Sequence, residues 1–486
     1  MTADLATLTG IDAPTGLLIG GHWGTGRGGT LAVTDPSTED VVAQVANATT
    51  EDALDAVTAA HDALPGWAAR PPRERGECLR RAFELMISRA EALARLMVVE
   101  NGKALKDARG EITYAAEFFR WYSEEAVRND GSLVLAPSGA NRIMVVRQPV
   151  GVSVLVTPWN FPAAMATRKI GPALAAGCTV VLKPAKETPL SALAIAGILQ
   201  EAGVPDGVVN VLPTTKPGPL VATMLADPRV RKLSFTGSTE VGRALLRTAA
   251  DTVTNCSMEL GGNAPFLVFE DADIEAAVEG AFLAKMRNGG EACTAANRFY
   301  VHDAVAGEFT ARLADRLSGL SVGPGLDDGV DLGPLVNSDT RSKVADLVES
   351  ATRDGGRLIT GGQVPDRRGY FYPPTVLDNV PRGAGILNEE IFGPVAPVVR
   401  FTDQADAIAQ ANNTEYGLVS YLYTRDLRRA LRVAEALEAG MIGVNRGVVS
   451  DPAAPFGGVK QSGLGREGGH DGLLEFTETK YIAVDW

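Results

Sequence analysis

Three side chains that are far apart in the sequence carry chemistry suited to attack on a carbonyl group. Cys293 lies in MRNGGEACTAANR (286–298), where glycines and small residues surround one thiol, and a thiolate is a strong nucleophile. Glu259, in SMELGGNAP, stands before an apolar run, where a carboxylate with a raised pKa can act as a general base. Asn160, in TPWNFP, offers an amide that can donate to an oxyanion. Taken singly, each has a plainer interpretation: an inert buried thiol, a helix-cap or surface glutamate, and a turn residue.

A second set of motifs is typical of a nucleotide site. TGSTEVGR (236–243) follows an apolar run and precedes a helical segment, and glycine-rich turns at helix N-termini bind phosphates through free backbone N–H groups. The motif is neither GxGxxG nor a Walker sequence, so an ordinary tight turn remains the alternative. Lys183 ends the run TVVLK, from which it can reach a ribose or a phosphate, or remain solvated. NEEIFGP (388–394) adds two carboxylates beside an aromatic ring and a turn.

These motifs follow apolar runs that must position them. From residue 150, short apolar runs alternate with helical segments, and a second alternating stretch extends from about 298 to 450. Alternation of this kind predicts a parallel sheet with helices on both faces, which binds ligands at the carboxyl ends of its strands. The predicted strands are 151–156, 179–183, 208–212, 232–235 and 264–269.

Two further regions lie outside this alternation. The first 130 residues are predicted to be helical, with one helix through 51–64 capped by Thr50, a long one over 71–102 that ends at Asn-Gly, and a third over 106–127. Segments 142–150 and 475–486 have the composition of strands. They form either an arm for subunit contact or a surface hairpin.

Composition excludes several classes of protein. A chain of 486 residues predicts two or three domains. The net charge of −13 argues against a nucleic-acid or anionic-membrane partner, and no apolar stretch is long enough to span a membrane. Four scattered cysteines and four histidines make a disulfide framework or a metal site unexpected. With no secretory signal at the N-terminus, the expected compartment is the cytoplasm.

Taken together and in this order, the segments resemble the NAD(P)-dependent aldehyde dehydrogenase family, from about residue 30 to the end. The resemblance is carried by PWNFP, GSTEVG, ELGGNAP, the cysteine segment, EEIFGP and PFGGVKQSGLGRE. It implies an α/β fold with a Rossmann-like cofactor domain (1–127 and 150–260) and an α/β catalytic domain (261–454). It also implies a β-strand oligomerisation arm (128–149 and 455–486), and arms of this kind join subunits into dimers, often paired into tetramers.

The resemblance implies a division of catalytic roles. Cys293 attacks the aldehyde, and the Asn160 amide with the Cys293 N–H holds the resulting oxyanion. Hydride transfer to the nicotinamide leaves a thioester, and Glu259 activates the water that hydrolyses it. Glu467, in LGRE, matches a second family carboxylate that assists proton movement.

Cofactor positions are implied in the same way. Lys183 matches the adenine-ribose ligand, and Glu390 matches the nicotinamide-ribose ligand with Phe392 beside it. Position 186 often carries a ribose-binding glutamate in members that prefer NAD, whereas Lys186 would attract a 2′-phosphate. NADP is therefore favoured over NAD, with use of both open. The remaining expected contacts are Gly237, Ser238 and Gly242 at the pyrophosphate, and Pro158 and Trp159 along the cofactor channel.

The substrate end most resembles the succinate-semialdehyde dehydrogenase branch. In that branch two arginines and a serine bind the distal carboxylate, and here these are Arg168, Arg287 and Ser450. The alternatives are a broader dehydrogenase for another ω-carboxy or phosphonate aldehyde, a relative that releases the thioester to coenzyme A, and a non-catalytic relative. No metal is expected.

Three residues depart from the branch pattern. Glu291 replaces the glutamine two residues before Cys293, and an extra carboxylate there is expected to raise the pKa of the thiol or repel an anionic substrate, unless it points away. Ala295 removes the second cysteine of a Cys-x-Cys redox switch. Arg446 adds a positive charge near the proposed substrate entrance, which would favour a longer or more acidic substrate.

Overall fold

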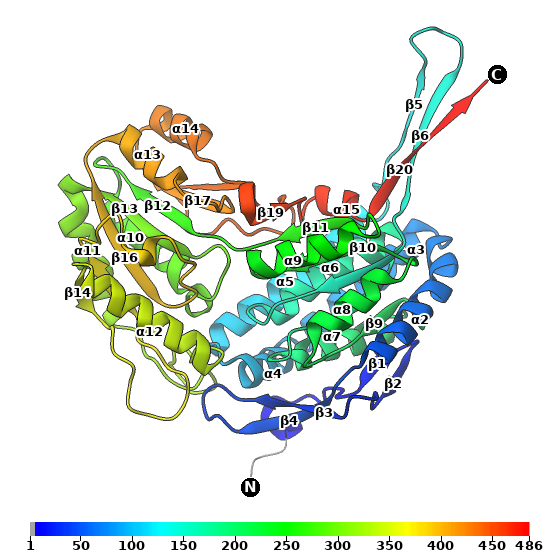
Figure 1. The fold of residues 1–486 in the computed structure, drawn as a ribbon, viewed down its shortest axis with the longest axis horizontal. Coiled ribbons are helices and arrows are strands. Elements are labelled where there is room, and N and C mark those ends of the chain that lie inside the picture. The colour runs from blue at the N-terminus through cyan, green and yellow to red at the C-terminus, as the bar shows by residue number, and fades with distance from the viewer. Residues whose placement is uncertain (1–4, 486) are drawn as a thin grey trace.

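A computed structural model describes residues 5–485, which form two α/β lobes and a projecting β-sheet (Figure 1). The first lobe is built on an eight-stranded sheet in the order β19-β11-β10-β7-β8-β9-β1-β2. Its five inner strands, β11 to β9, are parallel, and the strands at either end pair antiparallel. The strand bounds are β1 Leu17–Ile19, β2 His22–Gly24, β7 Val152–Val156, β8 Thr179–Lys183, β9 Val209–Val211, β10 Val230–Thr236, β11 Asn255–Glu259 and β19 Gly463–Leu464.

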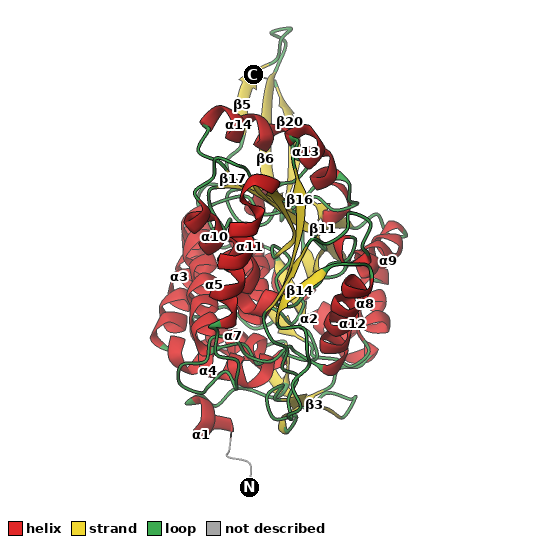
Figure 2. Cartoon of the chain, turned by 90° about the vertical axis from the view of Figure 1, so that its left-hand side faces the viewer, coloured by secondary structure: helices red, strands yellow, loops and turns green. Residues whose placement is uncertain are grey.

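Helices cover both faces of this sheet, as Figure 2 shows with the strands seen between two helical layers. One layer shares a hydrophobic core with the first face, and the other packs on the opposite face. The first layer comprises α3 (Pro72–Ser88), α4 (Ala90–Asn101), α5 (Leu105–Glu125), α6 (Pro162–Ala176) and α7 (Pro189–Glu201), with α1 (Leu5–Thr9) against α4. The second comprises α2 (Thr50–Ala68), α8 (Pro217–Ala226) and α9 (Thr239–Ala250).

The second lobe repeats this design on a seven-stranded sheet in the order β14-β15-β16-β13-β12-β17-β18. All its pairs are parallel except β14 with β15, and its two faces carry separate cores. Its strands are β12 Ala264–Val268, β13 Ala296–His302, β14 Arg357–Thr360, β15 Thr375–Asp378, β16 Val395–Phe401, β17 Val419–Tyr423 and β18 Met441–Val444. Its helices are α10 Ile274–Met286, α11 Asp303–Ser318, α12 Ser338–Arg353, α13 Gln404–Asn412 and α14 Leu427–Ala436, and the 3₁₀ turns are η1 Arg287–Gly290 and η2 Gly385–Leu387.

A three-stranded sheet extends away from both lobes and carries the C-terminal end of the chain (Figure 1). Strand β6 (Arg142–Pro149) lies between β5 (Ser132–Leu135) and β20 (Thr477–Val484), and both pairings are antiparallel. Residues 142–149 and 477–484, within the two segments expected to be strands, therefore pair with each other, although more than 300 residues separate them. The remaining elements are the hairpin β3 (Thr30–Thr34) with β4 (Val41–Ala46), η3 (Lys460–Ser462) and α15 (Asp471–Leu474).

The expected alternating α/β fold is confirmed, with local corrections. The helix expected from 51 begins at Thr50, and its cap is Thr49 rather than Thr50, because Thr49 and Asp52 form a reciprocal capping box. The helix expected over 71–102 breaks at Arg89 into α3 and α4. Strand β11, which was not predicted, pairs with β10 and ends at Glu259.

The domain limits remain a prediction, and one contact crosses them. Strand β19 falls in the segment expected to belong to the arm but pairs with β11 of the first sheet. Among residues 5–485, no helix is long and apolar enough to cross a membrane, and no group of His, Cys, Asp and Glu side chains is arranged to hold a metal.

Candidate active site

The parallel strands of the first sheet bring the sequence motifs to one edge. Strands β7, β8, β10 and β11 run parallel, so their carboxyl ends meet there. Lys183 and Glu259 are the last residues of β8 and β11, and Asn160 lies in the loop after β7. A cavity at this edge is lined by Asn160, Glu259, Cys293 and Glu390. Residues that are up to 230 positions apart in the chain therefore face one space.

Cys293 is held by a left-handed turn between α10 and β13. Asn288, Gly289 and Gly290 have φ values of 55°, 64° and 78°. A Cβ atom on Gly290 would lie 2.2 Å from the carbonyl oxygen of Gly393, so glycine is required there. Similarly, a Cβ atom on Gly262 would lie 2.5 Å from the Cys293 carbonyl oxygen. The glycines around the cysteine thus permit close backbone approach and fix the thiol at the cavity.

The thiol and Glu259 influence each other electrostatically. Burial, followed by the Glu259 carboxylate, raises the pKa of the Cys293 thiol well above its ordinary value. Burial also raises the pKa of Glu259, although the Arg168 guanidinium opposes the shift. Oε2 of Glu259 lies 3.3 Å from Nη2 of Arg168, and the carboxylate also forms a hydrogen bond with the Cys293 thiol. A buried carboxylate in contact with the thiol is suited to accept its proton.

Asn160 is fixed through both its backbone and its side chain. Its carbonyl oxygen accepts hydrogen bonds from Nζ of Lys103 (2.7 Å) and Nδ2 of Asn288 (2.8 Å). Its Nδ2 donates to the carbonyl oxygen of Glu291 at 3.0 Å. The amide nitrogen is therefore held on the loop that carries Cys293, where it can serve a developing oxyanion.

Arg168 and Lys169 of α6 connect the site to Glu467. Nε of Arg168 and Nζ of Lys169 each lie 2.5 Å from a Glu467 carboxylate oxygen. These two cations lower the pKa of Glu467 despite its burial. Lys169 also donates to Oγ of Ser234 at 3.0 Å. Because Arg168 contacts Glu259 as well, the two carboxylates share one buried guanidinium.

All the expected cofactor residues except Gly242 line two adjoining cavities. The second cavity is lined by Lys183 at the end of β8, by Lys186, and by Gly237 and Ser238 before α9. Burial lowers the pKa of Lys183 to about 8. Lys186 is 60% exposed and lies 3.8 Å from a Glu187 carboxylate oxygen. The group of cations at the end of β8 suits a phosphorylated ribose.

The residues expected to bind the nicotinamide lie in the cavity that Cys293 lines. Pro158, Trp159 and Phe392 line the same cavity as Cys293, and the Trp159 and Phe392 rings meet edge to face with centroids 5.3 Å apart. Oε1 of Glu390 accepts the N–H of Gly262 at 3.3 Å, and burial raises the pKa of Glu390 to about 7.

Residues of the glycine-rich turn differ in what they contact. Ser238 caps α9, where its hydroxyl accepts the N–H of Val241. Gly237 lines both cavities. Gly242 lines neither, and a Cβ atom there would lie 2.4 Å from a Leu260 methyl carbon, so its small size serves helix packing.

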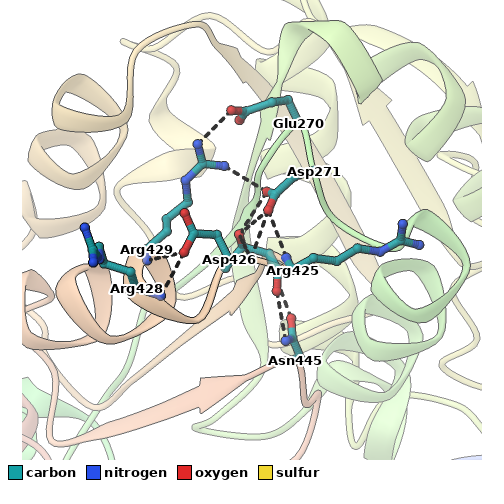
Figure 3. A network of polar contacts seen from close by, with 8 residues as sticks. Glu270, Asp271, Arg425, Asp426, Arg428, Arg429 and Asn445 are labelled. Carbon is teal, nitrogen blue, oxygen red and sulfur yellow. Dashed lines mark hydrogen bonds and ion pairs between the residues drawn. The ribbon is translucent and has the colours of Figure 1, made fainter.

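Arg287 and Ser450, which are 163 residues apart, are brought together with Nη1 of Arg287 3.2 Å from Oγ of Ser450. The segment carrying Ser450 is anchored at Asn445, whose amide bonds to both the N–H and the carbonyl of Thr424 (Figure 3). Asp271 in turn accepts from the Thr424 hydroxyl. Arg168, the third residue of the expected substrate site, contacts the two carboxylates instead of Ser450.

Tyr114 on α5 was missed by sequence reasoning. Its ring lies under the Arg287 guanidinium, 5.7 Å from centroid to Cζ, and its hydroxyl is buried without a hydrogen-bond partner. Burial, opposed by Arg168 and Arg287, raises the pKa of this hydroxyl. A helical tyrosine without a motif around it gives no sequence signal.

Comparison with known proteins decides the family. Residues 23–482 match the sequence profile of the aldehyde dehydrogenase family. The chain belongs to the aldehyde dehydrogenase family. This aldehyde dehydrogenase is therefore an oxidoreductase that acts on an aldehyde, and the expected family, fold and enzyme class are confirmed.

The relatives of this aldehyde dehydrogenase include several semialdehyde enzymes. It is 55% identical to a succinate-semialdehyde dehydrogenase of Paenarthrobacter nicotinovorans over 91% of this chain and 99% of that protein. It is 48% identical to a glutarate-semialdehyde dehydrogenase of Pseudomonas putida, over 96% and 97%. The crystal structure of an NADP-dependent enzyme of Escherichia coli superposes with a TM-score of 0.96 at 48% identity, over 98% of both chains.

Proposed function

We propose that this aldehyde dehydrogenase oxidises a short aldehyde that carries a distal carboxylate, with succinic semialdehyde as the leading candidate. The observation that supports it best is the contact between Arg287 and Ser450. A guanidinium and a hydroxyl that converge form a donor set for a carboxylate, and Arg287 stands six residues before Cys293 in the chain. The names of the succinate- and glutarate-semialdehyde relatives agree with this substrate class.

The proposed first half-reaction begins at Cys293. The thiol transfers its proton to Glu259, and the sulfur adds to the aldehyde carbon. The amide of Asn160 and the N–H of Cys293 stabilise the oxyanion of the thiohemiacetal. A nicotinamide dinucleotide held by the residues that line the two cavities would supply the hydride acceptor needed to convert the thiohemiacetal on Cys293 to a thioester.

The second half-reaction requires Glu259 as a free base, so Glu259 must first pass on the proton that it took from the thiol. We assign Glu259 to take a proton from the water that attacks the thioester; the acid is then released, and the departing thiolate takes this proton from Glu259 to restore the thiol. Arg168 stabilises the charged form of Glu259 in the resting state. A substrate carboxylate that draws Arg168 away would make Glu259 more basic, and Glu467 with Lys169 would carry the proton onward.

The cofactor is proposed to be NADP in preference to NAD. Lys186 would attract a 2′-phosphate, and it lines the cavity that Lys183 and Ser238 also line. The similar E. coli structure is described as NADP dependent. Glu187, close to Lys186, is positioned to retain some binding of a free ribose hydroxyl, so use of both cofactors is compatible with the site.

A longer substrate is the second candidate. Arg446, four residues before Ser450, is exposed and uses Nε to bond the Val448 carbonyl. Its charge would favour a longer semialdehyde such as glutaric semialdehyde. Transfer of the thioester to coenzyme A is disfavoured because Glu259 is retained beside Cys293.

The projecting sheet is proposed to join subunits into a dimer or a tetramer. Strands β5 and β20 are its edges, and unpaired edges favour association with another chain. Exposed apolar side chains on these strands are Leu133, Val134, Leu135, Tyr481 and Ile482. Light scattering coupled to size exclusion is expected to show a mass of two or four chains. The proposed compartment is the cytoplasm.

Steady-state kinetics test the proposed substrate. We expect kcat/KM for succinic and glutaric semialdehyde to exceed that for butanal by at least about 100-fold, because the neutral aldehyde lacks the carboxylate. Comparable values for butanal would refute the carboxylate site.

Cys293→Ala is expected to abolish oxidation and retain NADP binding, and equal activity in that variant would refute the mechanism. Acceleration by coenzyme A would support thioester transfer instead of hydrolysis.

A further inference from the structure

Glu291, two residues before the cysteine, is a buried carboxyl group that the proposed mechanism does not use. Its side chain is 3% exposed, and Oε1 accepts the backbone N–H of Val336 at 3.1 Å. Its backbone carbonyl accepts Nδ2 of Asn160 and Nδ2 of Asn288, each at 3.0 Å. One residue thus connects the oxyanion donor, the cysteine loop and the segment before α12.

No cation is available to balance a negative charge on Glu291. The nearest ammonium group, on Lys103, is 2.6 Å from Oε2 of Glu111 and also donates to the Asn160 carbonyl. Oε1 of Glu111 accepts the N–H groups of Ala163 and Ala164, so both oxygens of this carboxylate accept hydrogen bonds. The charge of Lys103 is therefore already matched.

The other charged groups around this region do not change that balance. Within the described chain, none of them lies within ion-pair distance of the Glu291 carboxyl group. The titratable or charged side chains on its own segment and on the neighbouring segments are Arg287, Cys293, Lys103, Asp107, Glu111, Asp331, Asp339, Arg341, Lys343, Glu389 and Glu390.

Desolvation disfavours an isolated buried carboxylate strongly, so such a group takes up a proton. Burial raises the pKa of Glu291 to about 8, against the smaller opposing effects of the Val336 N–H and Lys103. At neutral pH the residue is then a carboxylic acid with nearly the shape of the glutamine that it replaces. An un-ionised Glu291 neither repels an anionic substrate nor adds charge beside the thiol, which were the two effects expected of this residue.

We propose that Glu291 is a positioning residue that acts as an un-ionised acid: it holds its own carbonyl against the Asn160 amide, and its ionisation in alkaline solution lowers the rate of aldehyde oxidation. A buried anion at position 291 requires water or movement of the 288–293 turn. Either change displaces the acceptor that orients Asn160 and places negative charge near the developing oxyanion. The proposal rests on the proposed oxyanion role of Asn160.

The matched test is Glu291→Gln, which keeps the shape and cannot ionise. We expect the variant to match the wild-type kcat at pH 7 within about twofold. Between pH 7 and pH 9 the ratio of variant to wild-type kcat is expected to rise about tenfold, because a group with a pKa near 8 changes from mostly protonated to mostly ionised over that range. Titration of Cys293 or Glu259 affects both proteins and cancels in the ratio.

Thermal unfolding gives a second, independent readout. The native state holds the Glu291 proton more tightly than the unfolded chain, so the wild type loses stability relative to Glu291→Gln as pH rises from about 4.5 to about 8. We expect the Tm difference to grow over that range and then level off. A constant kcat ratio together with a constant Tm difference would overturn the proposal, and so would loss of activity in Glu291→Gln at pH 7 with an unchanged Tm.

Asn160→Ala separates this inference from the mechanism on which it rests. If Asn160→Ala keeps full activity, the oxyanion assignment fails and Glu291 has nothing to position. If Asn160→Ala loses activity and the Glu291→Gln ratio does not change with pH, the Glu291 proposal alone fails. If Asn160→Ala loses activity and the ratio rises with pH, both are supported.

Discussion

The sequence predicts the same role, binding of the substrate carboxylate, for Arg168 and Arg287, but the structure places them in different surroundings. Arg168 is 1% exposed, and its guanidinium lies 2.5 Å from Glu467 and 3.3 Å from Glu259. Arg287 has no carboxylate within ion-pair distance in the described chain, and its Nη1 bonds to the Ser450 hydroxyl. One cation is part of a buried charge network, and the other, which is proposed to bind the substrate, has no anionic partner among residues 5–485.

This difference separates two ways of recognising a carboxylate. An unpaired guanidinium gains a partner when the substrate binds, so Arg287 should contribute directly to affinity. A paired guanidinium must weaken an existing contact, so Arg168 should contribute less affinity and more stability. Its contact with Glu259 also means that substrate binding at Arg168 would change the basicity of the group that is proposed to activate water.

The largest effect should follow from removing the paired arginine. Arg168→Met leaves Glu259 without a cation and leaves Glu467 with Lys169 alone. We expect the free energy of unfolding to fall by about 3–5 kcal/mol, measured by urea denaturation at pH 7, because carboxylates in the interior lose their partner. Arg168→Lys keeps the charge and should recover part of this loss. Wild-type stability in Arg168→Met would show that the network contributes nothing to folding.

Removing the unpaired arginine should affect binding instead of folding. Arg287→Met is expected to lower kcat/KM for succinic semialdehyde about 100-fold, through loss of a charge-assisted contact worth about 2–3 kcal/mol. Butanal oxidation should change by less than about twofold, and the urea midpoint should stay near the wild-type value. An equal loss with both aldehydes would show that Arg287 shapes the active site without binding the carboxylate.

Parts of this site were accessible from the sequence because strand ends in a parallel sheet meet at one edge. Lys183 terminates the predicted strand β8, and the turn at 236–243 follows the predicted strand β10 and begins a helix, so local patterns were enough to group these two; Glu259 terminates β11, which was not predicted. The helix break at Arg89 was not accessible, because neither proline nor glycine marks it. The Thr49 cap was missed because either threonine satisfies the composition rule, and only Asp52 three residues later distinguishes them.

Long-range pairing was the part that the sequence could not provide. The contact between Arg168 and Glu259 joins residues 91 apart on α6 and β11, and the position of Tyr114 depends on how α5 packs against α6. No local periodicity encodes such contacts. The resemblance named Arg168 as a substrate ligand, and only the packed structure showed that its charge is already shared.

Lys186, the cation proposed to bind the cofactor, differs from both arginines because its side chain is exposed to solvent. Lys186 is 60% exposed, so water and salt screen its charge. Lys186→Ala is expected to lower kcat/KM for NADP by about 1 kcal/mol, or roughly fivefold, and to leave the NAD value unchanged. The difference should shrink when ionic strength is raised from 0.05 to 0.3 M. An equal loss with both cofactors would show that Lys186 does not contact the 2′-phosphate.

The smallest expected effect concerns the neutral partner of Arg287. Ser450→Ala removes one hydroxyl, and because a single neutral donor contributes about 0.6 kcal/mol net, KM for succinic semialdehyde should rise only about threefold. The double variant of Ser450→Ala with Arg287→Met tests whether the two side chains bind the same carboxylate. If the two side chains bind the same carboxylate, the double variant should lose less than the sum of the single losses, because removing the guanidinium already weakens the contact that the hydroxyl supports. Additive losses would mean that the serine acts on another part of the substrate, and the contact between the two side chains would then serve to orient the loop.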